Sequence, residues 1–366
     1  MPNRRKFLKD LTSTTGLMFV GCGLVDAVAQ SLLGDTPVKH APVVINGRRI
    51  RTVDVHAHCS VPKATDLLNQ QVNSSNLLLD GQALADRILR MDTQGIDVSV
   101  LSINPNWYGV DRDLATQVIT IQNEALAECC AAHTDRFAAF ASVALQYPEL
   151  AAGQLEHAMK KLGLRGAAIG GSVAGQELAD PKFHPFWAKA EELGAVIFIH
   201  PQGDAAGGFS NRLQGNGALS ISVWNPIETT IALSHLIFEG TLDRFPGLKI
   251  CAAHGGGYLP SYMHRTDHGC RVLPVQCKPG IPIKQPSEYL KRLYYDSLVL
   301  APEALRHLAA EVGASQILMG TDAPYPWVSE PVEHILNTPD LSGAERAAML
   351  GNNAVALLGL VPASWE

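Results

Sequence analysis

Two histidines separated by one residue stand at the end of a predicted strand, and they give the first sign of chemistry in this sequence. Residues 53–58 read Val-Asp-Val-His-Ala-His, and the alternation of apolar and polar residues predicts a strand over 52–56. Residues two apart in a strand project to the same side, so His56 and His58 could share one metal ion. A lone His-x-His pair is weak evidence, because polar residues at a strand exit need no metal.

Three more residues of metal-ligand type follow or end predicted strands further along the chain. His200 closes the apolar run 196–200, and His254 and Asp322 stand at the ends of two later apolar runs. Each alone has a structural explanation, since a histidine at a strand end is often a hydrogen-bonded core residue and an aspartate before Ala-Pro can form a turn. Four histidines and one aspartate at equivalent ends of strands together indicate a metal site.

This set of side chains suits a particular chemistry. Imidazoles and a carboxylate favour a borderline divalent ion, with Zn²⁺ expected first and Mn²⁺ as the alternative. Three or four protein ligands leave room for a water molecule, whose pKa a bound zinc ion lowers toward about 7. A histidine in the set that does not bind the metal can hold or move a proton.

The elements that must position these residues alternate along the chain. Short apolar runs alternate with segments of helical periodicity, and this order favours an α/β fold, the (β/α)₈ TIM barrel, over a doubly wound sheet. Barrel enzymes place their site at the C-terminal ends of the strands, where all five residues stand. We expect a linker over 30–50 and one catalytic domain over 51–366, with 60–81 and 203–217 as loops above its open end. The predicted strands are 52–56, 98–102, 137–141, 166–169, 196–200, 248–252, 293–296 and 317–322.

Residues 1–29 have the composition of an export signal. Arg4 and Arg5 precede a weakly apolar stretch over 11–25, and a small-x-small cleavage site follows. The pattern resembles a twin-arginine signal peptide, which predicts a periplasmic protein exported in the folded state. A basic tail on a cytoplasmic enzyme and a lipoprotein anchored through Cys22 are the alternatives.

Composition excludes several classes of protein. A net charge of −6 over 366 residues offers no basic surface for nucleic acid. The apolar stretch near the N-terminus is too short and too rich in Gly, Ser and Thr for a transmembrane helix. Six cysteines beyond Cys22, with no Cys-x-x-Cys, are too few for a disulfide framework in a chain of this size. We expect Cys129 and Cys130 mainly to be small buried apolar residues.

Four motifs resemble the amidohydrolase superfamily. They are Val-Asp-Val-His-Ala-His at 53–58, His-Pro-Gln-Gly at 200–203, Ala-His-Gly-Gly-Gly at 253–257 and Met-Gly-Thr-Asp-Ala-Pro-Tyr-Pro-Trp at 319–327. Together with the connecting segments 228–232 and 294–297, they are most similar to the branch that contains aminocarboxymuconate semialdehyde decarboxylase. The resemblance extends from residue 51 to 358 and implies a barrel with a metal site.

The resemblance also implies a role for each of the five residues. It implies metal ligands at His56, His58, His200 and Asp322. His254 is similar to the acid/base histidine of the family, which orients the catalytic water. The strands concerned end without a lysine that could be carboxylated, which argues for one metal ion and not two.

The chain keeps one substrate-binding arginine of the family and departs from the family at two other positions. Arg265 stands eleven residues past His254, at the position of a family arginine that reaches a substrate carboxylate in the neighbouring subunit, which implies a homodimer; a surface ion pair is the alternative. A second family arginine has no counterpart in 74–79, and Gln202 stands where the family has a tryptophan. Arg212, in the loop after the fifth strand, could supply the missing charge or simply be solvated. The departures put the substrate in doubt.

The resemblance favours a metal-dependent decarboxylase, a C–C lyase, that acts on an unsaturated or aromatic carboxylic acid. In this function His254 would manage the proton and Arg265 would hold a carboxylate. The alternative is a hydrolase of an ester, lactone or amide, in which Asp322 would take a proton. A non-catalytic binding protein is disfavoured, because all five ligand-type residues are present. Release of CO₂ separates the first function from the second.

Overall fold

The computed structural model describes residues 39–72, 74–203, 210–277 and 281–360. The chain divides between Val38 and Lys39 into two units, and all described residues belong to the second. The predicted signal segment, Cys22 and the first part of the predicted linker lie outside the described residues. Among the described helices, none combines the length and the apolar character that a bilayer crossing demands.

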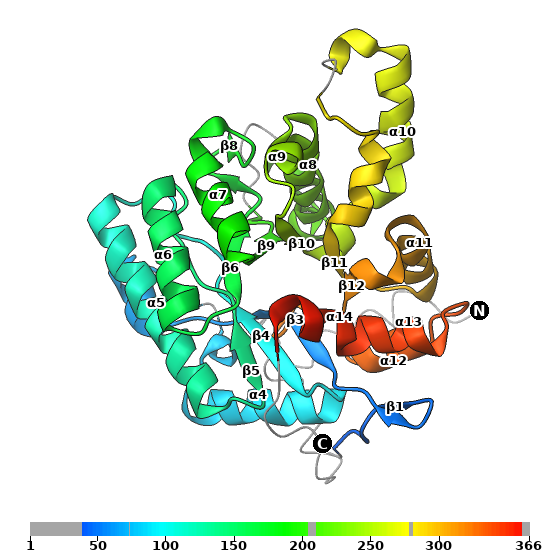
Figure 1. Cartoon of the computed structure of the whole chain (residues 1–366). Coiled ribbons are helices and arrows are strands. Elements are labelled where there is room, and N and C mark those ends of the chain that lie inside the picture. The colour runs from blue at the N-terminus through cyan, green and yellow to red at the C-terminus, as the bar shows by residue number, and fades with distance from the viewer. Residues whose placement is uncertain (1–38, 73, 204–209, 278–280, 361–366) are drawn as a thin grey trace, which may run out of the picture. The chain divides into compact units, whose positions relative to one another are not determined.

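Eight parallel strands close into a barrel, as predicted (Figure 1). Hydrogen bonding orders them β3-β4-β5 and β6-β9-β10-β11-β12. The bridge Ala141–Ala167 joins β5 to β6, and the bridge Ala57–Ala323 lies between β3 and the chain that follows β12. The strands are β3 (Val53–His58), β4 (Val98–Ser102), β5 (Phe137–Ala139), β6 (Gly166–Gly170), β9 (Val196–His200), β10 (Lys249–Ala252), β11 (Tyr294–Asp296) and β12 (Ile317–Leu318).

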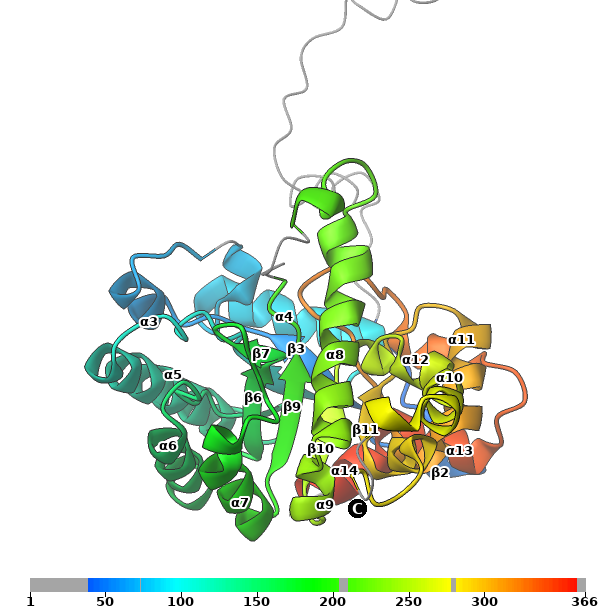
Figure 2. The ribbon, with the colours of Figure 1, turned by 90° about the horizontal axis from the view of Figure 1, so that it is seen from above.

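Helices connect the strands and surround the barrel (Figure 2). Gly95 and Gly194, with φ of 72° and 60°, end two of them in the left-handed conformation that glycine adopts most readily. Two short antiparallel pairs lie outside the barrel: β1 (Val44–Ile45) with β2 (Arg48–Arg49), and β7 (Ser172–Val173) with β8 (Gln176–Glu177). The main helices are α4 (Gly81–Gln94), α5 (Arg112–Ala132), α6 (Pro148–Lys161), α7 (His184–Leu193), α8 (Asn225–Phe238), α9 (Thr241–Arg244), α10 (Leu259–Val272), α11 (Pro302–Val312), α12 (Pro331–Leu336), α13 (Gly343–Ala347) and α14 (Asn353–Leu358).

Two apolar clusters hold the barrel together. Val55, Phe140 and Phe198 belong to the cluster formed mainly by inward-facing strand residues, which Leu358 of α14 joins. The rings of Phe140 and Phe198 are stacked with centroids 5.6 Å apart. A larger cluster fills the space between the strands and the surrounding helices. The interior is therefore packed, and a reactive site has to lie at an end of the barrel.

Two segments predicted to lack regular structure contain short elements. The predicted linker holds the antiparallel pair β1 (Val44–Ile45) and β2 (Arg48–Arg49). The predicted loop over 60–81 holds α3 (Pro62–Leu67) and a 3₁₀ turn at Ser75–Leu77. These elements are two to six residues long, too short for apolar periodicity to reveal them.

One further expectation was wrong. The eighth predicted strand, 317–322, ends as a strand at Leu318. Cys270, in the last turn of α10, forms a disulfide with Cys277, a single pairing that the sequence analysis did not predict. Cys129 is buried as predicted, whereas Cys130 is only partly so. A disulfide over a seven-residue separation depends on the local path of the chain, which cysteine counting does not reveal.

Candidate metal centre

A bulge in β3 turns both of its histidines toward the barrel interior. The register between β3 and β4 shifts over residues 54–57, so the side chains on either side of this shift do not follow simple alternation. Val55 faces the interior cluster, yet the ring of His56 also lies inside, 5.0 Å from that of Phe198. His58 follows with its ring 4.9 Å from that of His56. Bulges commonly redirect side chains at active sites in this way.

The structure brings the five predicted residues together. Nε2 of His56 lies 3.1 Å from Nε2 of His58 and 3.2 Å from Oδ1 of Asp322. Oδ1 of Asp322 is also 2.7 Å from Nε2 of His58, and its Oδ2 is 3.7 Å from Nε2 of His254. The ring of His200 lies 4.6 Å from that of His58. Ligand atoms of His56, His200, His254 and Asp322 all lie within 4.8 Å of one another, which defines a site for a divalent metal ion.

The hydrogen bonding of these side chains fits a metal ion. Within the described part of the chain, neither ring nitrogen of His200 has a hydrogen-bond partner, and Nδ1 of His58 has none. Buried polar atoms are normally satisfied, and His200 is only 6% exposed. Burial, reinforced by the neighbouring histidines, holds the pKa of His200 well below its ordinary value. A neutral imidazole with a free lone pair is the form that binds a metal ion.

Asp322 supplies the negative charge of the centre. Burial opposes its ionisation, but His56, His254 and His58 outweigh this effect and hold the pKa of Asp322 far below its usual range. One carboxylate with several imidazoles is a donor set that suits zinc or manganese. The residues present therefore fit a divalent ion.

His254 and Asp322 have strained backbones. Their φ angles are 54° and 61°, in the left-handed region that costs a non-glycine residue on the order of 1 kcal/mol or more. The N–H of Asp322 donates to the carbonyl of His56 at 2.8 Å, and the N–H of His254 donates to Asp296 at 2.9 Å. These bonds maintain two conformations that aim the side chains at the centre.

Asp296 is a functional residue that the sequence analysis did not single out. Its Oδ2 lies 2.6 Å from Nδ1 of His56 and also accepts the N–H of His254, while its Oδ1 accepts the N–H of Gly255 at 2.9 Å. Burial opposes its ionisation, but the hydrogen bond and charge of His56 leave its pKa below the ordinary value. A proton on Nδ1 of His56 leaves Nε2 free for the metal. Asp296 could have been identified from the sequence, because it is an acidic residue at the C-terminal end of a predicted barrel strand.

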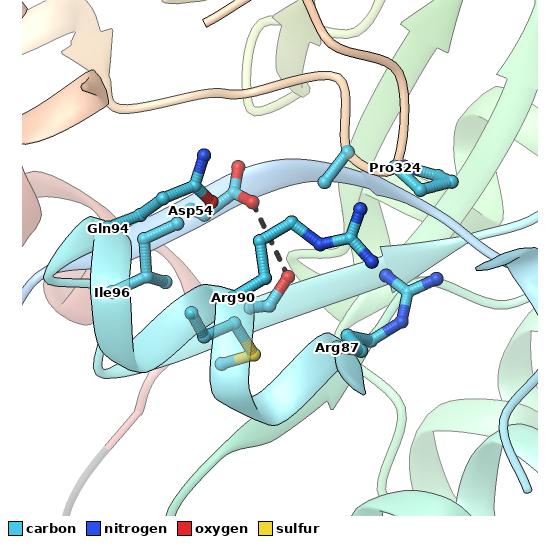
Figure 3. A pocket seen from close by; sticks show the side chains of 9 residues that line it. Asp54, Arg87, Arg90, Gln94, Ile96 and Pro324 are labelled. Atoms are coloured by element: carbon cyan, nitrogen blue, oxygen red, sulfur yellow. Dashed lines mark hydrogen bonds between the residues drawn. The ribbon is translucent and has the colours of Figure 1, made fainter. Parts of the chain in front are cut away.

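A second buried aspartate fixes the strand behind the metal centre. Oδ1 of Asp54 accepts the N–H groups of His56 and Thr321, at 3.0 and 3.1 Å. Its Oδ2 accepts the hydroxyl of Thr321 at 2.7 Å and that of Ser99 at 3.4 Å, the bond drawn in Figure 3. Burial raises the pKa of Asp54 to about 6 despite these bonds. Asp54 thus joins β3 to the chain that follows β12.

Arg87 of α4 supports the same strand from outside the barrel. Figure 3 shows it beside Arg90, on the helix next to the strand that carries Asp54. Nη2 of Arg87 donates to the carbonyl oxygens of His58 and Asn76, at 2.7 and 3.1 Å. The side chain is buried, and burial lowers its pKa. It ties the end of β3 to the segment that follows α3.

A pocket of about 410 Å³ reaches the metal centre. Trp327 lines it and offers an aromatic surface, whereas Trp107 and Tyr108, in the loop after β4, are buried core residues. Arg212 and Arg265 are exposed and are not among the described residues that line the pocket. The lining residues are Asn104, His200, Pro201, Gln202, Gly203, Ser220, Ile221, Asn225, Asp322, Tyr325, Pro326 and Trp327.

This chain resembles known enzymes over most of its length. The amidohydrolase family model matches residues 53–360. The chain is 34% identical over 280 residues to 2-amino-3-carboxymuconate-6-semialdehyde decarboxylase of Dictyostelium discoideum, covering 75% of this chain and 76% of the relative. It is 30% identical over 286 residues to gamma-resorcylate decarboxylase of Polaromonas sp., covering 75% and 86%.

A solved structure shows the same architecture. Dihydroxybenzoic acid decarboxylase of Polaromonas sp., with bound manganese and the inhibitor 2-nitroresorcinol, superimposes with a TM-score of 0.70 at 28% identity, covering 85% of this chain and 97% of that chain. Barrel, metal-binding side chains and sequence relationship all agree. The chain belongs to the amidohydrolase family.

Proposed function

We propose that this protein is a metal-dependent decarboxylase of an aromatic or unsaturated carboxylic acid. The observation that carries the proposal is the cluster of His56, His200, His254 and Asp322, which reaches a pocket through His200 and Asp322, in a chain that is similar to decarboxylases of such acids. Trp327 and Tyr325 offer flat faces to a planar substrate, and the described pocket lining carries no lysine or arginine. A metal ion held by these residues would therefore supply the main positive charge of the pocket.

The residues of the site have two separate roles in this reaction, metal binding and proton transfer. A bound divalent ion supplies the positive charge that binds and stabilises anionic oxygen atoms. Decarboxylation breaks the bond between the carboxylate group and the substrate carbon that bears it. The electron pair left on that substrate carbon must take up a proton. His254 is 3.7 Å from Asp322, which lines the pocket, and its side chain is 15% exposed, so it can hold that proton and deliver it. We assign metal binding to His56, His58, His200 and Asp322.

Removal of the metal tests this function. We expect the loaded protein to release CO₂ from one or more hydroxybenzoic or unsaturated acids, and a chelator to abolish the release. Zn²⁺, which we propose as the natural ion, or Mn²⁺, the ion in the Polaromonas structure, should restore it. Elemental analysis of the purified protein and separate recording of CO₂ and acid are the measurements. Acid release without CO₂ would instead support the alternative, a hydrolase of an ester, lactone or amide.

We also propose a homodimer in which Arg265 of one subunit reaches the substrate of the other. Arg265 lies exposed on α10 and does not line the pocket of its own chain. A position away from its own site is compatible with a role in a neighbouring one. Sedimentation of the metal-loaded protein as a monomer at micromolar concentration would contradict the proposal. Arg212, also exposed, stays a candidate for substrate binding.

The export prediction gains support from the disulfide. Disulfides persist in oxidising compartments such as the periplasm and are rare in the cytosol, and Cys270 is joined to Cys277. We propose that the protein acts in the periplasm after removal of residues 1–29. Protein from the periplasmic fraction should begin at Gln30 and show no reactive thiol at Cys270 or Cys277 before reduction. A cytosolic protein that keeps Met1 would refute the proposal.

A further inference from the structure

We infer that Gln202 determines which acids fit the pocket, and that Glu228 positions it. The inference rests on the proposed function, because it names a specificity residue for the proposed decarboxylation. Gln202 stands two residues after His200, and both residues line the pocket together with Asp322. It is therefore placed to meet the part of an acid that would lie beside the metal centre.

A buried carboxylate fixes the backbone of Gln202. Its N–H lies 3.0 and 3.1 Å from the two carboxylate oxygens of Glu228, and the N–H of Gly203 donates to Oε2 at 3.2 Å. Glu228, on α8, is only 7% exposed. Hydrogen bonds to a charged acceptor are roughly twice as strong as neutral ones. The loop after β9 is thus held at a defined distance from the metal centre.

The side chain of Gln202 is held independently of its backbone. Nε2 donates to the carbonyl oxygen of Pro105, in the loop after β4, at 2.9 Å. Gly170 at the end of β6 leaves the space that the carboxamide occupies, since a Cβ on Gly170 would stand 2.7 Å from Cδ of Gln202. The N–H of Gly170 in turn donates to the hydroxyl of Tyr108 at 3.2 Å. Segments from three strand ends therefore meet at this one side chain.

This arrangement gives the pocket a wall that cannot easily yield. A half-buried glutamine on an unrestrained loop would swing away from a bulky ligand, whereas Gln202 would have to break its bond to Pro105 or collide with Gly170. Its carboxamide is neutral, so it selects by shape and not by charge. We expect the wall to exclude acids with a large substituent on the side that faces the loop after β9.

Substitution of Gln202 by alanine tests the inference. With a series of benzoic acids that carry hydrogen, methyl, methoxy or propoxy at one position, affinity for the wild-type protein should fall at the largest groups. Gln202→Ala should raise the ratio of kcat/KM for large over small acids by about tenfold or more, the range that one or two methylenes are worth in a pocket. Gln202→Met, which keeps the length but cannot donate to Pro105, should shift the ratio part of the way toward that of Gln202→Ala, because the bond that holds the side chain in place is lost. An equal ratio in the wild-type protein and Gln202→Ala would overturn the inference.

Further measurements separate this inference from the proposed function. Calorimetric binding of the same acids to the metal-loaded proteins reports selectivity without turnover. A wild-type protein that releases no CO₂ refutes the decarboxylase, while the binding series still decides the role of Gln202. Metal content should be unchanged in each variant, and Gln276→Ala, an exposed glutamine near the disulfide, should match the wild-type protein throughout. Glu228→Gln should raise KM more than it lowers kcat, with normal metal content; a normal KM would remove Glu228 from the proposal.

Discussion

The Asp322→Asn protein is expected to lose its metal ion and nearly all activity. Asp322 brings the negative charge to a centre otherwise made of imidazoles, with Oδ1 at 2.7 and 3.2 Å from Nε2 of His58 and His56. An amide has the same shape but no charge, so the ion loses its anionic ligand. Loss of roughly 4 kcal/mol of charge stabilisation corresponds to about 10³-fold in rate. Metal content per chain and initial rates of CO₂ release are the measurements.

Asparagine is the suitable substitution because of the backbone at this position. Asp322 has a φ of 61°, and asparagine tolerates the left-handed region better than alanine does. The variant should therefore fold, which far-ultraviolet circular dichroism can verify. Asp113→Asn, at an exposed site in the first turn of α5, is the matched control and should keep both metal and activity. A stoichiometrically loaded, active Asp322→Asn protein would show that another residue anchors the ion.

The His254→Asn protein should keep its metal ion and lose turnover. His254 is the candidate that holds or delivers the proton, and general acid–base groups contribute about 10² to 10⁴-fold. The loss should fall on kcat with little change in KM, because the proton moves in the transition state and not on binding. Asparagine again suits the backbone, since φ of His254 is 54°.

Metal content distinguishes two roles for His254. Its ligand atom lies in the same cluster as those of His56, His200 and Asp322, so a role as a fourth ligand would appear as metal loss in the variant. Normal metal content with unchanged kcat would refute the proton role itself. His157→Asn, an exposed histidine on α6, controls for the substitution.

Local patterns were enough to predict most of the barrel. The strands over 98–102 and 196–200 were predicted with the bounds that they have, because buried parallel strands are continuous apolar runs. The prediction for the eighth strand, β12, extended it too far, to residue 322. It ends at Leu318, and Asp322 leaves the strand path to donate to the carbonyl of His56. That bond joins residues 266 positions apart, so no local pattern encodes it.

In the candidate site, too, local patterns predicted the residues, whereas part of the geometry depends on contacts between distant segments. His56, His58, His200, His254 and Asp322 could be identified from residue type and from their positions at strand ends, and the structure brings all five together. That His56 and His58 project together was predicted from strand alternation and is confirmed, but the face of the strand from which they project could not be predicted. With strict alternation the side chains of His56 and Val55 would lie on opposite faces of β3. The bulge in β3 instead turns both toward the barrel interior. A bulge arises from strand pairing across the sheet, which is a tertiary interaction.

By itself the sequence determined the α/β class, the order of the strands and the residue types at their C-terminal ends, because these follow from apolar periodicity and chemistry within a few positions. Only the tertiary structure decided that Asp296 orients His56, that Cys270 pairs with Cys277, and that Gln202 is held against Pro105. The physical reason is distance along the chain. A hydrogen bond, or the meeting of two loops at one pocket, depends on how separate elements pack, and that packing is settled when the barrel closes.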